Sequence, residues 1–261
     1  MSLSPGDDDR WIRCFDPRSD SGLRLVCFPH AGGSASSYYA LSKALPATEV
    51  LAVQYPGRQD RRLEPCVENI PELADRIYDA LGRRARAPYA FFGHSMGAVL
   101  AFEVAQRLRA DGATPPVHLF ASSRRAPARR REEAVYLRSD AGMVAELRRL
   151  GGTDERFLAD EELLAGILQV ARADYRAIET YHWTPAPPLT CPVTVLMGDS
   201  DPHTTRDEAA AWADHTTGPF DLHVFPGGHF YLDPAAAPVT DLLATTLAGT
   251  VPAGRPERSS P

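Results

Sequence analysis

The chain has 261 residues, of which 44% are hydrophobic, so it can bury a substantial core as one large domain with an inserted subdomain. Its formal net charge of -6 at pH 7 argues against a general polyanion binder, and we expect no nucleic-acid partner. The cysteines show neither a CxxC pair nor zinc-type spacing, which disfavours metal and disulfide roles for Cys14, Cys27, Cys66 and Cys191.

Short apolar runs alternate with longer amphipathic segments along the chain. This alternation is typical of an α/β fold, in which a mostly parallel central sheet is flanked by helices. In chain order, the expected strands are 23–28, 49–55, 89–93, 117–122, 193–198 and 220–225. The expected helices in the remaining segments are 38–45, 70–84, 98–111, 205–215 and 238–247.

One interval breaks this rhythm, because about 70 residues separate the expected strands at 117–122 and 193–198, far more than one crossover helix needs. It opens with the arginine-rich stretch "SSRRAPARRRE" and continues with two helical patterns, near 141–150 and 161–181. We interpret 124–185 as a helical lid, because loops at the carboxyl ends of parallel strands frame active sites. The alternative is a helical elaboration packed on the edge of the sheet.

We expect the lid to be inserted in a single domain over 10–250, with flexible termini at 1–9 and 252–261. No stretch offers the roughly 18 uninterrupted apolar residues of a membrane span, and the acidic N-terminus lacks an apolar signal core. The sequence therefore predicts a cytoplasmic protein with reduced thiols and no membrane partner, and we expect a monomer.

The pentapeptide GHSMG, residues 93–97, places Ser95 between two glycines. An apolar run before it predicts a strand and the run after it predicts a helix, which is the setting of a nucleophilic serine on a sharp strand-to-helix turn. Such a turn is crowded, so the positions two before and two after the serine must be very small. Gly93 and Gly97 meet that need, and Ser95 is the expected nucleophile.

A nucleophilic serine needs a base, and the base needs a carboxylate, in the chain order Ser, Asp or Glu, His for this architecture. The expected strand VTVLMG is followed by DSDPH, and FDLHVF is followed by PGGHFYL. His229 is therefore the expected base, whereas His203 has no comparable placement. The acid is Asp201 or Asp199; we favour Asp201, because the loop then has room to turn back under the histidine, and Asp199 suits a turn cap.

The same chemistry needs an oxyanion hole, built from the N–H after the nucleophile and an N–H of the loop after an early strand. Met96 supplies the first. The stretch "FPHAGGSASSYY" follows the strand at 23–28, and its small residues allow close approach of the backbone to a substrate. Ala31 is the expected second donor, and the alternative for "HAGG" is a flexible turn.

Five motifs, "FPHAGGSASSYY", "QYPGR", "GHSMGA", "RADY" and "PGGHFYL", together resemble the type II thioesterases, the free-standing editing enzymes of polyketide and nonribosomal peptide pathways. The resemblance runs from about Trp11 to Leu247 and implies the α/β-hydrolase fold. By position it implies Ser95 as nucleophile, Asp201 as acid, His229 as base, and Ala31 and Met96 as oxyanion donors. One departure is Gln169, where family members often place a proline.

The resemblance also implies the substrate, an acyl group held as a thioester on the phosphopantetheine arm of an acyl or peptidyl carrier protein, with no separate cofactor. Five arginines between positions 124 and 131 suggest steering of such an acidic partner, and the alternative is a solvated loop. Two other functions remain open. One is a carboxylesterase or lipase for small free esters, and the other is a noncatalytic protein that docks a carrier.

Overall fold

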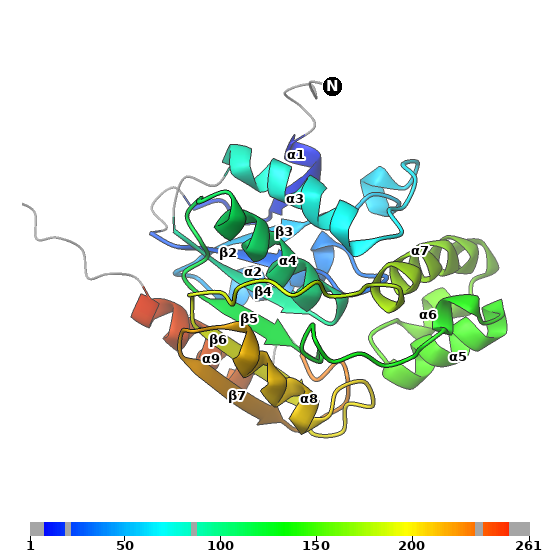
Figure 1. Ribbon diagram of the computed structural model, residues 1–261. Helices are drawn as coiled ribbons and strands as arrows, with labels where there is room; N and C mark the ends of the chain where they lie inside the picture. The colour runs from blue at the N-terminus through cyan, green and yellow to red at the C-terminus, as the bar shows by residue number, and fades with distance from the viewer. Residues whose placement is uncertain (1–7, 19–21, 85–87, 233–236, 251–261) are drawn as a thin grey trace, which may run out of the picture.

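A central sheet organises the computed structural model, which describes residues 8–18, 22–84, 88–232 and 237–250 (Figure 1). Within these ranges the sheet has seven strands in the order β1-β3-β2-β4-β5-β6-β7. All neighbours pair in parallel except β1, which runs antiparallel to β3. The strands are β1 Ile12–Cys14, β2 Arg24–Phe28, β3 Glu49–Val53, β4 Tyr89–His94, β5 Leu119–Ser122, β6 Val193–Gly198 and β7 Phe220–Phe225.

The six parallel strands correspond to the six expected strands, and the predicted α/β architecture is confirmed. Every residue of β3, β4, β5 and β6 is buried, because helices cover both faces of a parallel sheet. Four ends differ from expectation: β3 stops at Val53 and β5 starts at Leu119, each a difference of two residues, while β2 starts at Arg24 and β4 ends at His94, each a difference of one. Strand β1 was not expected, because three residues are too few to show an alternating pattern.

The expected helices are also present, with small differences at their ends. The segment 38–45 forms a 3-10 turn followed by α2, and 205–215 forms α8 followed by a 3-10 turn. The described helices are α1 Asp8–Trp11, α2 Tyr39–Ala44, α3 Ile70–Arg84, α4 Met96–Ala110, α5 Asp140–Leu150, α6 Glu155–Leu158, α7 Glu161–Glu179, α8 Arg206–Ala210 and α9 Ala237–Thr250. No described helix is long and apolar enough to cross a membrane. Of the termini expected to be flexible, 1–7 and 252–261 lie outside the described residues, and Asp8 begins α1.

Two hydrophobic clusters fill the space between the sheet and its helices, one on each face. Side chains alternate along a strand, so Val26 and Phe28 of β2 enter one cluster while Leu25 and Cys27 enter the other. The first cluster also contains apolar side chains of α3 and α4, and the second contains those of α2 and α9. The sheet is therefore held rigidly, and the loops at its carboxyl edge start from fixed points.

Helices α5, α6 and α7 lie between β5 and β6 in the chain and stand together beyond the carboxyl ends of the strands (Figure 1). We call residues 124–185 the insert. The insert has its own small core, which includes Met143, Leu147, Leu158 and Tyr175. A side-chain cap starts both longer helices: Ser139 accepts from the Gly142 N–H, and Asp160 accepts from two backbone N–H groups. The insert thus packs as a unit of its own above the sheet edge.

Candidate active site

Ser95 occupies the sharp turn between β4 and α4. Its backbone has φ 55 and ψ -118, a left-handed conformation that is rare for a residue with a side chain. The Ser95 N–H donates to the carbonyl of Ser122 at 2.8 Å, so the neighbouring strand β5 holds the turn in place. Strained backbone that the surroundings enforce is characteristic of functional sites.

The two glycines around Ser95 are required by close contacts with neighbouring backbone. A Cβ atom at Gly93 would lie 2.2 Å from the carbonyl oxygen of Gly97. A Cβ atom at Gly97 would lie 1.9 Å from the carbonyl oxygen of Phe28, at the end of β2. Helix α4 therefore starts in contact with the sheet only because both positions lack a side chain.

The side chains of Ser95, His229 and Asp201 form one hydrogen-bonded row. His229 Nε2 lies 3.0 Å from Ser95 Oγ, and His229 Nδ1 lies 3.0 Å from both carboxylate oxygens of Asp201. A carboxylate only accepts, so Nδ1–H is the donor and Nε2 of the neutral ring is free to accept from the serine hydroxyl. Asp199 does not reach this row, because it accepts from the Gly227 N–H at 3.1 Å.

The row is largely shielded from water. The side chains of His229 and Asp201 are 4% and 0% exposed. Burial raises the pKa of Asp201, but the hydrogen bond and charge of His229, with the N–H of His203, outweigh burial and leave that pKa below its usual value. Asp201 is therefore an anion at neutral pH.

The residues expected to form an oxyanion hole come from two different elements. Met96 is the first residue of α4, and the opening N–H groups of a helix have no partner inside that helix. Ala31 follows β2 and lines the same cavity as Ser95 and His229. The next N–H of that loop, from Gly32, donates to Asp174 of α7 at 2.7 Å, so the insert fixes the loop that carries Ala31.

Asp174 is held in turn by Arg58. The two side chains form an ion pair in which Asp174 is 1% and Arg58 is 7% exposed. Arg58 Nη1 also donates to the carbonyl of Pro56 at 2.7 Å. Charged pairs as buried as this one persist only when their hydrogen bonds are made, and the contact joins two of the quoted motifs, "QYPGR" and "RADY".

Above the row lies a cavity of about 580 Å³ with two kinds of wall. One wall belongs to the insert and carries apolar side chains, including Leu147, Phe157 and Ile167. The other wall is the loop after β2, with Ala31 and Gly32, and the floor holds Ser95. The cavity can therefore receive an apolar chain whose polar end lies at the serine.

His30 and His94, which flank the site, are not alternative bases. Desolvation lowers the pKa of His30 to about 3, and the charges of His229 and Arg58 act in the same direction. Burial likewise lowers the pKa of His94 far below its usual value. His94 Nδ1 lies 2.9 Å from Ser122 Oγ, and the ring of His30 packs edge-on against Phe230. Both rings stay neutral and serve as packing and hydrogen-bonding groups.

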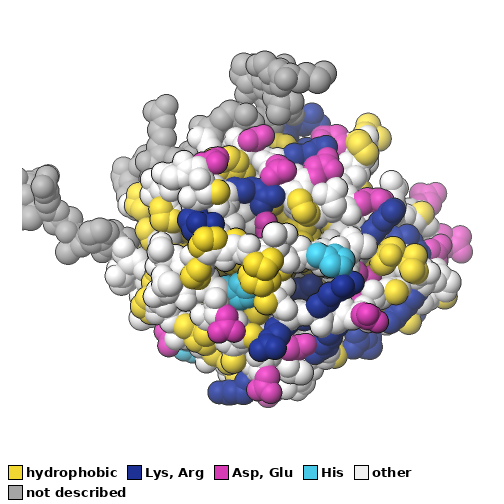
Figure 2. Space-filling view, viewed as in Figure 1, with side chains coloured by type: hydrophobic (Ala, Val, Ile, Leu, Met, Phe, Trp, Pro, Cys, Tyr) yellow, Lys and Arg dark blue, Asp and Glu magenta, His cyan; other side chains and the backbone are white. Residues whose placement is uncertain are grey.

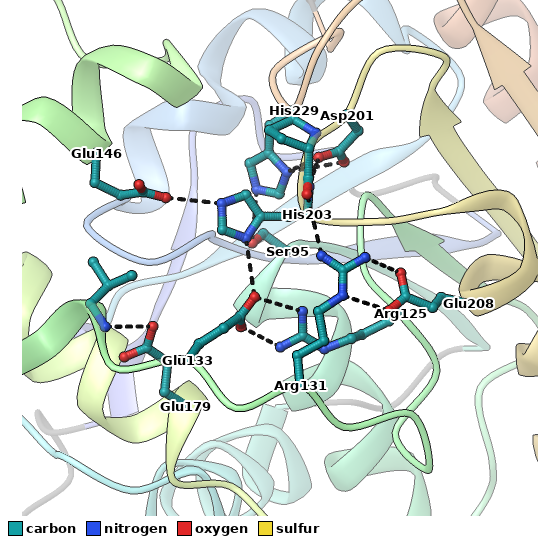
Figure 3. A network of polar contacts seen from close by, with 12 residues as sticks. Ser95, Arg125, Arg131, Glu133, Glu146, Glu179, Asp201, His203, Glu208 and His229 are labelled. Atoms are coloured by element: carbon teal, nitrogen blue, oxygen red, sulfur yellow. Dashed lines mark hydrogen bonds and ion pairs between the residues drawn. The ribbon is translucent and has the colours of Figure 1, made fainter.

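His203 is the feature of this site that the sequence did not reveal. The backbone N–H of His203 donates to Asp201 at 2.8 Å, and the centre of its ring lies 5.3 Å from that of His229. Its ring atom Nε2 lies 2.9 Å from Glu146 of α5 (Figure 3). Burial lowers the pKa of His203, and the charge on His229 lowers it further. The sequence showed no placement of His203 comparable to that of His229 and did not indicate this contact, because Glu146 is remote in the chain and leaves no local pattern.

The described part of the chain contains no group of three or more His, Cys, Asp or Glu side chains placed to hold a metal ion. The hydrogen-bonded row meets the large cavity through Ser95 and His229, which both line it.

Comparisons with known proteins agree on one family. The family model described as "Thioesterase domain" matches residues 23–246. A probable cadicidin biosynthesis thioesterase of Streptomyces griseus is 50% identical over 253 residues, which cover 97% of this chain and 68% of that protein. Thioesterase PikA5 of Streptomyces venezuelae is 50% identical over 234 residues, which cover 87% of this chain and 82% of that protein.

A solved structure gives the same answer. The type II thioesterase BorB from the borrelidin biosynthetic cluster is similar with a TM-score of 0.85 and 49% sequence identity, and the match covers 92% of this chain and 98% of that one. This likeness confirms the expected α/β-hydrolase fold and the resemblance to type II thioesterases. A family match over most of the length, together with relatives at half identity, shows that the chain belongs to the thioesterase family and is a hydrolase of thioesters.

Proposed function

We propose that this protein is an editing thioesterase that removes acyl groups from the phosphopantetheine arm of acyl or peptidyl carrier proteins in polyketide or nonribosomal peptide assembly lines. One observation carries the proposal: the row of Ser95, His229 and Asp201 lies at the floor of a cavity with an apolar wall. The likeness to proteins named type II thioesterases supports the choice of substrate class.

In the first half of the reaction, Ser95 Oγ attacks the thioester carbonyl carbon while His229 Nε2 takes the hydroxyl proton. The carbonyl oxygen becomes an oxyanion, for which the N–H groups of Met96 and Ala31 are the proposed donors, each worth about 3 kcal/mol. The C–S bond then breaks, the acyl group stays on Ser95, and the sulfur leaves with the proton from His229. Asp201 stabilises the positive charge that His229 carries between these steps.

In the second half, a water molecule takes the position of the departed thiol. His229 removes a proton from this water, whose oxygen attacks the acyl carbon, and the proton then returns to Ser95 Oγ as the ester bond breaks. The products are a free carboxylic acid and a carrier protein with a free thiol. The proposed scheme uses no cofactor. A thiol with a pKa of about 8.5 is a good leaving group.

The walls of the cavity suit the proposed acyl substrate. The insert presents apolar side chains that can cover an acyl chain, while the loop around Gly32 leaves room for the polar arm. The wall formed by Leu147, Phe157 and Ile167 is therefore where we place selection among acyl groups.

The test compares one set of acyl groups loaded on a carrier protein, on free pantetheine and on a simple alcohol as the ester. We expect the fastest turnover on the carrier, and a loss of at least about 10³-fold in Ser95→Ala. The matched control is Ser200→Ala, which removes an exposed hydroxyl bonded to Asp199 and keeps wild-type rates.

Three results would contradict the proposal. Equal or faster turnover of the free esters would identify a general esterase instead. Hydrolysis that survives unchanged in Ser95→Ala would refute the mechanism, and a chain that binds carriers without any hydrolysis would be a docking protein.

A further inference from the structure

A second and smaller cavity, of about 170 Å³, lies on the other side of the insert's base and is rich in arginine. Most of its lining comes from two segments that are distant in the chain, the stretch after β5 and the end of α7 with the residues that follow, and Val99 of α4 also lines it. The side chains that matter here are those of Arg124, Arg125, Arg129, Arg130, Arg131 and Trp183. We call this the arginine cavity.

Two of these arginines are neutralised by carboxylates, and three are not. Arg125 pairs with Glu133, and Arg131 pairs with Glu208 at 2.5 Å. Among the described residues, no carboxylate forms an ion pair with the remaining arginines of the cavity, Arg124, Arg129 and Arg130. In the space-filling view, Lys and Arg side chains gather over the segment between β5 and α5 (Figure 2). The cavity thus holds an excess of positive charge on a chain whose net charge is -6.

Two buried donors at this cavity also lack partners. Arg124 Nε and Trp183 Nε1 are both buried, and neither makes a hydrogen bond to any described residue. Desolvation and the neighbouring charge of Arg125 lower the pKa of Arg124 to about 9, so this guanidinium is still charged at pH 7. The charges of Glu133 and Glu179 raise that pKa in part, but neither carboxylate forms an ion pair with Arg124, and a buried cation is costly unless an anion approaches it.

Arg124 connects the two cavities, because it lines both the arginine cavity and the cavity above Ser95. Ile178 and Glu179, at the end of α7, also line both. Glu179 accepts hydrogen bonds from the N–H groups of Val135 and Tyr136, each at 3.1 Å, so its carboxylate is already engaged. The two cavities are therefore neighbours that share Arg124, Ile178 and Glu179 in their walls.

We propose that the arginine cavity binds the phosphate of the phosphopantetheine arm, and so sets the position from which the thioester reaches Ser95. The inference rests on the proposed function, and it adds a site for the phosphodiester. Guanidinium groups bind phosphate with short, charge-assisted hydrogen bonds, and clustered positive charge beside a low-dielectric wall attracts an anion strongly. A phosphate would add negative charge beside Arg124, Arg129 and Arg130, which form no ion pair with a described carboxylate.

The decisive experiment compares two small substrates that differ only in the phosphate: an acyl-pantetheine and the same acyl-4'-phosphopantetheine, both without carrier protein. For the wild type we expect a kcat/KM about 10-fold higher for the phosphorylated substrate, mainly through a lower KM, and a difference that shrinks with added salt. In Arg129→Gln/Arg130→Gln, which alters two exposed side chains, this ratio should fall at least about 5-fold. In Trp183→Phe, which replaces the indole and its N–H by a smaller phenyl ring, it should fall by less.

Arg62→Gln is the matched control, because it removes an exposed arginine that does not line the arginine cavity, and it should keep the wild-type ratio. The same acyl group on a carrier protein separates the two possible sources of the effect. If the double variant loses activity only on the carrier, the arginines contact the carrier surface and the phosphate site is wrong.

Failure of this inference is distinct from failure of the proposed function. A ratio near one in the wild type, with hydrolysis that still depends on Ser95, would overturn the phosphate site and leave the thioesterase mechanism intact. A double variant with the wild-type ratio would overturn it in the same way. Absence of hydrolysis on every acyl thioester would overturn the proposed function, and the phosphate site with it.

Discussion

Asp174 on helix α7 accepts a hydrogen bond from the backbone N–H of Gly32, 142 residues earlier in the chain. This 2.7 Å hydrogen bond links the insert to the loop that carries Ala31, and the same Asp174 carboxylate forms an ion pair with Arg58. The loop proposed to bind the oxyanion is therefore braced by a charge that belongs to the insert, so the position of α7 and the geometry of the catalytic loop are linked.

Replacement of the charged Asp174 should lower both the stability of the protein and its catalytic rate. In Asp174→Asn the buried Arg58 loses its ion pair, and we expect the free energy of unfolding in urea to fall by about 3–5 kcal/mol. The loop around Gly32 should loosen, with a loss of about 10-fold or more in kcat. The matched control is Asp140→Asn, which breaks an exposed pair with Arg172 and should cost under about 1 kcal/mol. Equal effects of the two changes would show that burial of the pair contributes nothing.

Addition of a methyl group at Gly97 should strain the start of α4. The new Cβ would lie 1.9 Å from the Phe28 carbonyl, so helix and strand must separate, and we expect a loss of about 3 kcal/mol in the free energy of unfolding. In contrast, Gly166→Ala lies in α7 with open space around it and should gain up to about 1 kcal/mol. Denaturant melts of both variants test this, and a neutral Gly97→Ala would contradict the packing argument.

Substitution of the two aspartates of the DSDPH stretch should have very different effects on kcat. Asp201→Asn removes the negative charge beside His229 and favours the wrong ring tautomer, so kcat should fall by about 10³- to 10⁴-fold. Asp199→Asn changes contacts with the Gly227 N–H and the Ser200 hydroxyl, both away from His229, and should stay within about 3-fold of wild type. Steady-state rates of both variants on one acyl thioester test this prediction. A larger loss of kcat in Asp199→Asn than in Asp201→Asn would assign the role of the acid to Asp199.

The Glu146 carboxylate should make the protein sensitive to acid. Burial raises its pKa, but hydrogen bonds from Arg149 and His203 outweigh burial and lower it from 4.5 to about 2. Between these two values the unfolded chain binds the proton more readily than the folded chain, so the free energy of unfolding rises with pH there. The stabilisation is complete above about pH 4.5 and disappears as the pH falls through about 2.

Glu146→Gln should therefore flatten the pH dependence of stability on the acid side. We expect the free energy of unfolding to fall less between pH 6 and pH 3 in the variant than in the wild type, whatever the variant's stability at pH 6. Urea melts at a series of pH values measure this difference. Parallel curves for the two proteins would mean that Glu146 titrates alike in the folded and unfolded chains.

Much of the fold could be predicted because its signals are local. Six strands appear in the sequence as apolar runs, and α3 appears at 70–84 with the same bounds, because a buried face requires a regular spacing of apolar residues. Strand β1 could not be predicted, since its pairing of Ile12 with Val53 depends on a partner elsewhere in the chain. The short α6 was missed for a similar reason, because its Leu158 is buried only against the rest of the insert.

The proposed site was likewise predictable from the sequence only in part. The sequence by itself determined that Ser95 stands on a strand-to-helix turn, and that an aspartate and a histidine follow later strands, because strand ends and tight turns leave short-range patterns. The tertiary structure alone decided that Asp201 rather than Asp199 faces His229, and that His203 meets Glu146. It also decided that Asp174 braces the loop of Gly32. Hydrogen bonds act over about 3 Å and in fixed directions, so contacts between remote segments depend on the whole path of the chain and leave no local trace in the sequence.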